Sequence, residues 1–238
     1  MIAPAVLVVS PGAGSATVDD LLSRPIVLVV ALALISLLPF AFMTVTAFVK
    51  IATVLQIVRG AIGAQNVPSS TVIMALAGAL TFIAMAPVGD KIMARITPLV
   101  AGQEGHDTSV LVQKGVEAVR APMHEFLTAN SSRSERSRFF DVAKGARPES
   151  ERAEVHDDDF SVVIPAFLVT ELRDAFAVGF LIYLPFLVID LVISNVLLAL
   201  GMQMMSPTQV SLPFKLLLFV ATDGWGLLAR SLVSGYKT

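Results

Sequence analysis

The chain has 238 residues, of which 55% are hydrophobic and 15% are charged, and its mean hydropathy is +0.77. Soluble domains carry charge on about a quarter of their residues, so this composition indicates a membrane-associated chain. The formal net charge of −2 gives no argument for a nucleic-acid partner. The lack of cysteine excludes disulfides and thiolate metal sites.

Residues 1–25 form an N-terminal segment that is apolar and small at its start. A secretory signal needs basic residues before its apolar core, and no Lys or Arg precedes residues 1–18. The sequence therefore does not favour a cleaved signal peptide at this end.

Residues 26–90 are predicted to form a first apolar helical hairpin. Its first arm, Ile26 to Val49, runs for 24 residues without a charge, which is enough to cross a hydrocarbon core of about 30 Å. We expect Pro39 to kink this arm, and the apolar run continues to Val58, too far for one straight span. A turn rich in Pro, Asn and Ser leads to the second arm, Thr71 to Val88.

Residues 91–160 form a polar insert between the apolar regions. Its apolar residues recur at spacings of three and four, which is typical of one face of an amphipathic helix. We expect this face to pack against a neighbouring subunit or against the chain's own hairpins. The stretch Asn130 to Asp159 is dense in Ser, Arg, Glu and Asp and predicts an exposed linker. The amphipathic face comprises Val112, Val116, Val119, Met123, Phe126 and Leu127.

Residues 161–238 are predicted to form a second apolar hairpin with a C-terminal tail. Its first arm, Phe176 to Leu200, carries one carboxylate at Asp190, and its second arm carries Lys215. An ionisable group in an apolar helix suggests either a function or a partner. Asp190 lies 14 residues before Met204, the expected tip, and Lys215 lies 11 residues after it. At about 1.5 Å per residue the two charges reach nearly the same level, which predicts a structural ion pair; the alternative is that each faces a water-filled cavity.

These patterns together predict an all-α fold in which two apolar helical hairpins flank a polar, partly helical insert. The last apolar arm has an uninterrupted core of only Leu216 to Ala221, far below the roughly 20 residues that a crossing needs. Segments that are apolar yet kinked, charged or short are better explained by burial against protein than by lipid. We therefore expect the chain to be integral to a helical oligomeric membrane assembly.

Three methionines, Met202, Met204 and Met205, stand at the expected tip of the second hairpin. Methionine is unbranched and fills irregular gaps without demanding one geometry, so these residues could simply be core filler. Repeated around an oligomer axis, however, they would form a soft, apolar constriction that excludes water. The sequence thus makes them candidates for a pore constriction.

Catalysis, a cofactor and a metal ion find no support in the sequence. The three histidines all lie in the polar insert, and none has a second histidine four residues further on, so the chain has no zinc-binding helix of the zincin type. Ser, Asp and His occur at no spacing that suggests a triad, and there is no Gly-x-Ser-x-Gly elbow. We predict that the protein is not an enzyme and uses no cofactor.

Two blocks of the sequence are recognisable. The first includes Leu38–Phe40, Phe48–Ile51, Arg59–Gly63 and Leu80–Val88, and the second is the run IPAFLVTELRDAFAVGFLIYLPFLVIDLVISNVLLALG followed by MMSPTQVSLPFKLLLFVATDGW. From about Pro39 to Trp225 the chain closely resembles the R-type core export-apparatus protein of type III secretion, the SctR/FliP family.

The resemblance implies an all-helical subunit of a homo-oligomer, pentameric in the family, that assembles with S-type and T-type subunits into a protein-conducting gate for unfolded polypeptide. U-type and V-type components and the secreted proteins in transit are further implied partners. The implied location is the bacterial inner membrane, multi-pass, with the assembly projecting to the periplasmic side. By position, the resemblance assigns Met202, Met204 and Met205 to the family's methionine gasket, and Gln203 among them departs from the family's pattern.

Two further choices are open at the level of sequence. The motif Gln65-Asn66-Val67-Pro68 and the lack of a clean signal peptide favour the injectisome branch of the family over the flagellar branch. The alternative function is a small-molecule or ion carrier that uses the embedded Asp190 and Lys215 as its site. An intramembrane hydrolase is the third possibility, and no group of residues supports it.

Overall fold

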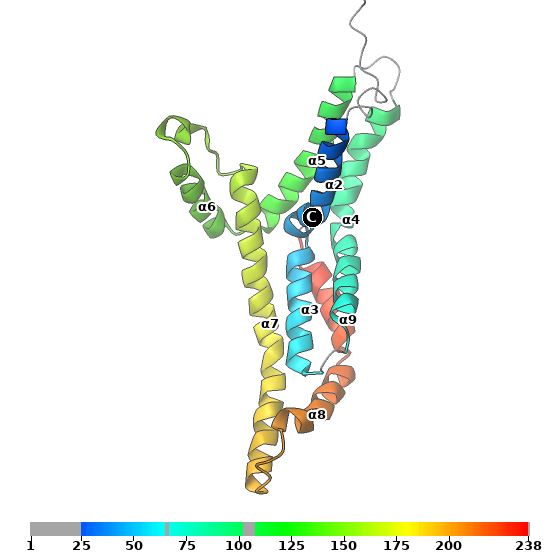
Figure 1. Ribbon diagram of the computed structural model, residues 1–238, viewed down its shortest axis with the longest axis vertical. Helices are drawn as coiled ribbons and strands as arrows, with labels where there is room; N and C mark the ends of the chain where they lie inside the picture. The colour runs from blue at the N-terminus through cyan, green and yellow to red at the C-terminus, as the bar shows by residue number, and fades with distance from the viewer. Residues whose placement is uncertain (1–24, 65–66, 102–107, 238) are drawn as a thin grey trace, which may run out of the picture. The chain divides into compact units, whose positions relative to one another are not determined.

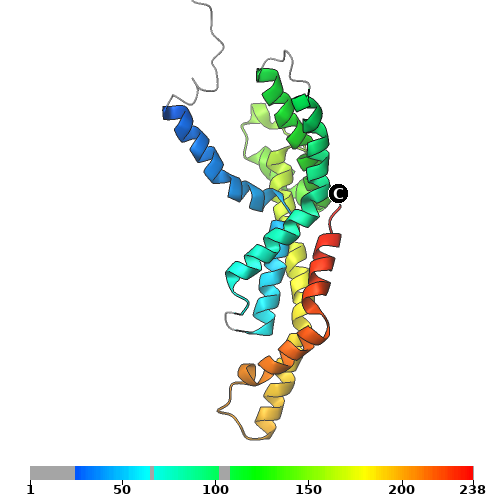
Figure 2. The ribbon, with the colours of Figure 1, turned by 90° about the vertical axis from the view of Figure 1, so that its right-hand side faces the viewer.

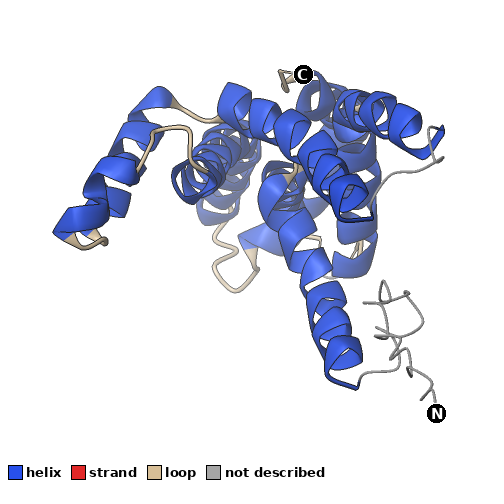
Figure 3. Cartoon of the chain, turned by 90° about the horizontal axis from the view of Figure 1, so that it is seen from above, coloured by secondary structure: helices blue, strands red, loops and turns tan. Residues whose placement is uncertain are grey.

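The computed structural model describes residues 25–64, 67–101 and 108–237, and these residues form helices and no strand (Figures 1 and 3). The all-α prediction is therefore confirmed for this part of the chain. Residues 1–24 of the predicted N-terminal segment, and Gln65 and Asn66 of the predicted turn, lie outside it. The chain forms two compact units, Met1–Ala41 and Phe42–Thr238, and the second holds the packed core.

The first apolar run is divided into two helices, α2 (Pro25–Val45) and α3 (Phe48–Ile62). Pro39 stays inside α2, and the interruption falls at Thr46. The Thr46 hydroxyl donates to the carbonyl four residues before it at 2.7 Å and accepts from the backbone N–H two residues after it at 3.4 Å. Because the hydroxyl competes for backbone groups in this way, we attribute the break to this threonine. The kink expected at Pro39 stays a prediction.

The second arm of the first hairpin is α4 (Ser70–Ala101), which packs beside α3. Gly63 ends α3 in the left-handed region at φ 76°, and its N–H donates to the carbonyl of Arg59 at 3.4 Å. The Arg59 guanidinium then donates to the Ser70 hydroxyl at 2.7 Å, which joins the two arms across the turn. α4 continues past residue 90, where the first hairpin was predicted to end.

The polar insert is more regular than its composition indicates. It contains α5 (Thr108–Asn130), α6 (Arg133–Gly145) and a short 3-10 helix, η1 (Glu149–Glu154). The stretch predicted as an exposed linker, residues 130–159, is mostly exposed and yet contains α6 and η1. α6 packs against the start of the next helix, and this tertiary contact overrides the weak tendency of so polar a segment to form a helix alone.

The amphipathic face of α5 is packed at one end only. Phe126 and Leu127 are buried and Met123 packs against the same small core. The other half of the face, Val112 and Val116, is 61% and 60% exposed. The chain's own helices thus cover the C-terminal half of the predicted face.

α7 (Phe160–Ala199) is the longest of the described helices, and α3, α5, α6 and α8 pack against it (Figures 1 and 2). Its 40 residues span about 60 Å, twice the thickness of a hydrocarbon core. α3 lies close against it at Gly179, where a Cβ atom would come within 2.5 Å of the Ile57 side chain. A glycine is needed at this position because two helices meet there.

The second hairpin closes through α8 (Pro207–Ala221) and α9 (Gly224–Ser234). The two helices are bent by 58°, and Asp223 between them has a positive φ of 50°. α9 returns alongside α4, and the tail after it reaches the level of α5 (Figure 2). The predicted second arm is thus a broken helix.

By length and composition, two helices could cross a membrane, Ser70–Leu99 within α4 and Phe160–Ala199. Two broken pairs, Ile35–Val45 with Phe48–Ile62 and Pro207–Ala221 with Gly224–Ser234, pass the same test when each is taken as one span. In the most apolar part of α7 only 11% of the residues are buried within the chain. Lipid or other protein must cover the remaining apolar surface, because water would not.

Candidate functional site

The second hairpin places the predicted charges Asp190 and Lys215 side by side. The Lys215 ammonium lies 2.7 Å from Asp190 Oδ2, and the lysine side chain is 4% exposed against 32% for the aspartate. The Ser211 hydroxyl donates to the other carboxylate oxygen at 2.6 Å. Both partners of the carboxylate come from α8, so this contact ties α8 to α7.

Lys215 also reaches a third helix. Its ammonium donates to the carbonyl of Ala61 at 3.2 Å, in the last turn of α3, where backbone carbonyls lack a helical partner. A cation at a helix C-terminus is favoured by the helix dipole as well. We call Asp190, Ser211, Lys215 and the Ala61 carbonyl the tip cluster; it holds α3, α7 and α8 together.

The three predicted methionines lie on the turn between α7 and α8. Met204 is fully exposed, and Met202 and Met205 are 41% and 44% exposed. Gly201 begins the turn at φ 70°, and the N–H of Met202 donates to the carbonyl of Leu197 at 2.9 Å. This is the Schellman arrangement that ends many helices at a glycine. The turn is thus built by backbone contacts, and its methionine side chains are left available to other surfaces.

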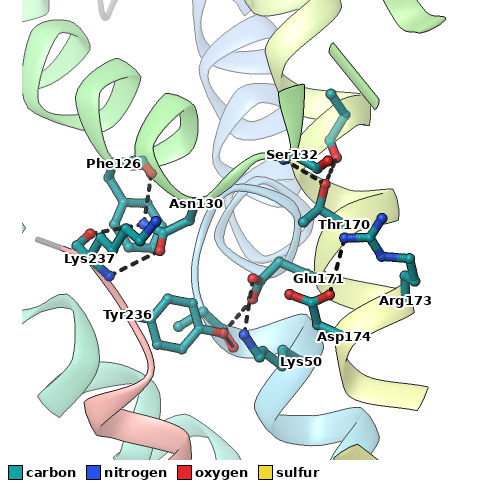
Figure 4. A network of polar contacts seen from close by, with 12 residues as sticks. Lys50, Phe126, Asn130, Ser132, Thr170, Glu171, Arg173, Asp174, Tyr236 and Lys237 are labelled. Atoms are coloured by element: carbon teal, nitrogen blue, oxygen red, sulfur yellow. Dashed lines mark hydrogen bonds and ion pairs between the residues drawn. The ribbon is translucent and has the colours of Figure 1, made fainter. Parts of the chain in front are cut away.

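A second buried charge pair, which the sequence analysis did not single out, joins α3 to α7. The Lys50 ammonium lies 3.5 Å from Glu171 Oε1, with the two side chains 14% and 1% exposed. The Tyr236 hydroxyl, from the tail after α9, donates to the other oxygen of Glu171. Figure 4 shows Lys50 and Tyr236 converging on this carboxylate. We call these three residues the central cluster.

The tyrosine ring is held as firmly as its hydroxyl. The ring stacks on Phe126 of α5 with centroids 5.9 Å apart, and the Lys50 ammonium lies 4.9 Å from its centroid. Burial raises the pKa of Tyr236, and the negative charge of Glu171 raises it further. The phenol therefore keeps its proton and serves as a donor to the carboxylate.

Asn130, the last residue of α5, fixes the tail beside this cluster (Figure 4). Its side-chain amide donates to the carbonyl of Lys237 at 2.9 Å, and its side-chain oxygen accepts from the N–H of the same residue at 3.0 Å. The side-chain amide thus both donates to and accepts from one backbone residue, as a residue of a neighbouring β-strand would. The C-terminal tail is thus bound to both the insert and the central cluster.

Sequence contains a partial signal for the central cluster. Glu171 stands in an apolar helix, and its neighbours four residues away on either side are Phe167 and Ala175, both fully buried. Spacing alone could thus have placed the carboxylate on the buried face. Its partners lie 121 residues before it and 65 residues after it, and no local pattern connects them.

The described residues contain no group of three or more His, Asp or Glu side chains that could hold a metal ion. The buried charges in the two clusters are engaged with one another and with fixed backbone groups. What the arrangement does chemically is to add fixed polar contacts between helices that already share an apolar core.

Comparison with known proteins extends these observations. The family model described as the FliP family matches residues 31–232. The chain is 42% identical over 210 residues to the "Hypersensitivity response secretion protein HrcR" of Ralstonia nicotianae, covering 88% of this chain and 96% of that protein. It is 43% identical over 209 residues to the "Yop proteins translocation protein R" of Yersinia pestis, covering 88% of this chain and 95% of that protein.

A flagellar protein is similar to the same degree. The "Flagellar biosynthetic protein FliP" of Cereibacter sphaeroides is 44% identical over 203 residues, which are 85% of this chain and 64% of that protein. The region that matches the family model, residues 31–232, includes nearly all of both hairpins and the insert. It leaves out the tail that carries Tyr236.

Proposed function

The chain belongs to the FliP family, and we propose that it is a non-enzymatic subunit of a type III secretion export gate in the bacterial inner membrane. The observation that carries this proposal is the match of 42–43% identity over 88% of the chain to proteins named for secretion and translocation. In this role the chain forms, with S-type and T-type subunits, a conduit for unfolded polypeptide.

The uncovered apolar surface supports an oligomer. Phe180, Leu181 and Val188 on α7, and Leu217 and Val220 on α8, are each more than half exposed in the single chain. In an assembly of several copies, five by resemblance to the family, neighbouring helices would bury these faces. The U-type and V-type components would add to the same assembly, and its bulk would project to the periplasmic side.

The methionine turn supports a constriction in that conduit. The turn between α7 and α8 carries Met202, Met204 and Met205. The tip cluster joins these two helices and so holds the turn in place. Copies arranged around one axis would bring these turns together as a gasket that excludes water and yields to a passing chain. The apparatus belongs by this proposal to the injectisome branch, which the Gln65–Pro68 motif favours.

Native mass spectrometry tests the proposal. The chain is expressed with its neighbouring S-type and T-type subunits, extracted in mild detergent and weighed as an intact complex. We expect several copies of the chain together with both partners, and we expect loss of export of the apparatus's own substrates when the gene is deleted. A chain that is recovered alone, in a strain whose export survives the deletion, would contradict the proposal.

A further inference from the structure

A surface pocket between α6 and the segment that leads into α7 has no part in the proposed conduit. Its volume is about 590 Å³. The pocket combines two arginines and a histidine with two apolar side chains and one carboxylate: Arg133, Arg136, His156, Phe140, Val155 and Asp157. A polar pocket of this composition suggests a bound group that carries negative charge.

The positive charges of the pocket share one face of α6. Arg133, Arg136 and Phe140 follow one another at spacings of three and four, and Lys144 continues the same row. Residues at these spacings are neighbours on a helix surface. The Lys144 ammonium lies 4.7 Å from the centroid of the Phe140 ring, so this aromatic side chain is flanked by cations.

In the described part of the chain, the two pocket arginines lack carboxylate partners, as do the exposed Arg152 and its neighbour Arg147 in the same insert. Arg120, Arg138 and Arg173 each form an ion pair with a Glu or Asp. Among the described residues neither Arg133 nor Arg136 does. In this same part of the chain the Arg136 Nε atom is buried and makes no hydrogen bond. A buried donor without an acceptor is unfavourable, and an anion in the pocket would relieve it.

The position of these arginines does not stabilise α6. Arg133 and Arg136 occupy the first turns of the helix, where the helix dipole disfavours cations and favours anions. The arginines and the helix end therefore attract the same kind of group. An anion that binds here would gain from both, and it would also remove the repulsion between the arginines and the dipole.

Both walls of the pocket are fixed before any ligand binds. The N–H of Ser132, at the start of α6, donates to the Thr170 hydroxyl on α7 at 3.0 Å. On the other wall, the N–H of His156 donates to the Asp159 carboxylate at 2.9 Å, and Val155 is buried. A site whose walls are already ordered loses less entropy on binding.

We propose that this pocket binds the carboxylate of an acidic peptide segment in which an apolar residue adjoins the acid. A guanidinium presents a planar fork of donors that matches a carboxylate. Phe140, beside the arginines in the lining, gives the apolar neighbour a contact surface. Asp157 in the same lining lowers the preference for a doubly charged phosphate.

Fluorescence anisotropy with the full chain in an uncharged maltoside detergent tests the site. The probe is a rhodamine-labelled, amidated peptide, Gly-Leu-Glu-Leu-Glu-Gly. We expect Arg133→Gln with Arg136→Gln to weaken its binding at least about tenfold. Lys114→Gln with Arg152→Gln removes the same two charges from exposed positions outside the pocket and should leave binding unchanged. The same peptide with Gln in place of Glu should not bind.

A second measurement needs no variant, so it stands even if the double substitution unfolds α6. The unmodified chain is placed in phosphatidylcholine nanodiscs and treated with phenylglyoxal, which reacts with arginine, and the modified sites are read by mass spectrometry. We expect the peptide to protect Arg133 and Arg136 and to leave the exposed Arg152 reactive.

The proposal is overturned if the peptide neither binds nor protects these arginines, or if binding survives their replacement. It is also overturned if phosphatidylglycerol added to the nanodiscs protects them while the peptide does not, because the pocket would then be a lipid headgroup site. None of these readouts uses protein export, so the outcome is independent of the proposed conduit.

Discussion

Glu171 and Asp190 are both carboxylates on α7 that face a lysine, yet their surroundings differ. In the central cluster, Glu171 is 1% exposed and its partners come from α3 and from the C-terminal tail. In the tip cluster, Asp190 is 32% exposed and both of its partners lie on the adjacent α8. The first carboxylate depends on segments distant in sequence, and the second depends on its own hairpin.

This difference indicates that the two clusters stabilise the fold in different ways. A deeply buried charge is tolerable only while every partner is present, so the central cluster makes the start of α7, α3 and the tail depend on one another. Asp190, with about a third of its side chain exposed in the single chain, is less enclosed and so depends less on any one partner. The tip cluster therefore fixes the register of the hairpin, and losing one of its members should destabilise the whole fold less.

Removing Lys50 should have the largest effect on stability. Lys50→Met leaves Glu171 as an uncompensated buried charge, which typically costs about 3–5 kcal/mol of unfolding free energy. The loss can be followed by unfolding in mixed detergent micelles, with the fluorescence of the single Trp225 as the probe. Arg173→Met is the matched control, because that residue pairs with Asp174 at the surface and should cost below about 1 kcal/mol. Equal losses for the two variants would show that Glu171 does not rely on Lys50.

Variants of the tip cluster should lose less unfolding free energy, and the double variant should show whether the two charges act as a pair. We expect Lys215→Met and Asp190→Asn each to cost about 1–3 kcal/mol and to lower the yield of assembled complex on a native gel. The double variant should lose less than the sum of the singles, since no lone charge remains. Additive losses would mean that the two groups act separately. A carrier site, in contrast, would tolerate either single change in assembly and lose only transport.

The tyrosine of the tail should contribute less again. Tyr236→Phe keeps the ring that stacks on Phe126 and removes only the hydroxyl that donates to Glu171. We expect a loss of about 1–2 kcal/mol by the same Trp225 measurement. Tyr183→Phe on α7 is the control, since no hydrogen bond from its hydroxyl occurs among the described residues. If the two substitutions cost the same, the tail does not stabilise the buried carboxylate.

Sequence reasoning reached the tip cluster because a hairpin brings residues at equal distances from its tip to one level. Asp190 and Lys215 satisfy that condition, and the structure places them 2.7 Å apart. The central cluster obeys no such rule. Its three residues come together only when α3, α7 and the tail pack against one another. The positions of charges along the chain do not indicate that packing.

Elements held by a local pattern are predictable from the sequence, and elements held by tertiary contact are not. The long apolar runs identified the helical arms of both hairpins, since apolar length is a strong signal, but not the breaks at Thr46 and Asp223. The helix α6 was missed because its stretch is dense in Ser, Arg, Glu and Asp, and its order comes from contact with α7. The break at Thr46 was missed because one hydroxyl sets it. The division of the chain into four regions stays a prediction.

The smallest stability effect is expected at the methionine turn, just beyond the tip cluster. Replacing Met202, Met204 and Met205 by Ala removes side chains that are exposed in the single chain, so the unfolding free energy should change by less than about 0.5 kcal/mol. If these side chains meet around an axis, their loss widens the constriction. We expect the assembled complex to form normally, to leak ions across a proteoliposome membrane and to continue exporting.

Gln203→Ala is the control in the same turn, and it should leak no more than the unaltered protein. A triple variant that assembles and leaks no more than the unaltered protein would reduce the methionines to packing residues, and the seal would then have to lie elsewhere in the assembly.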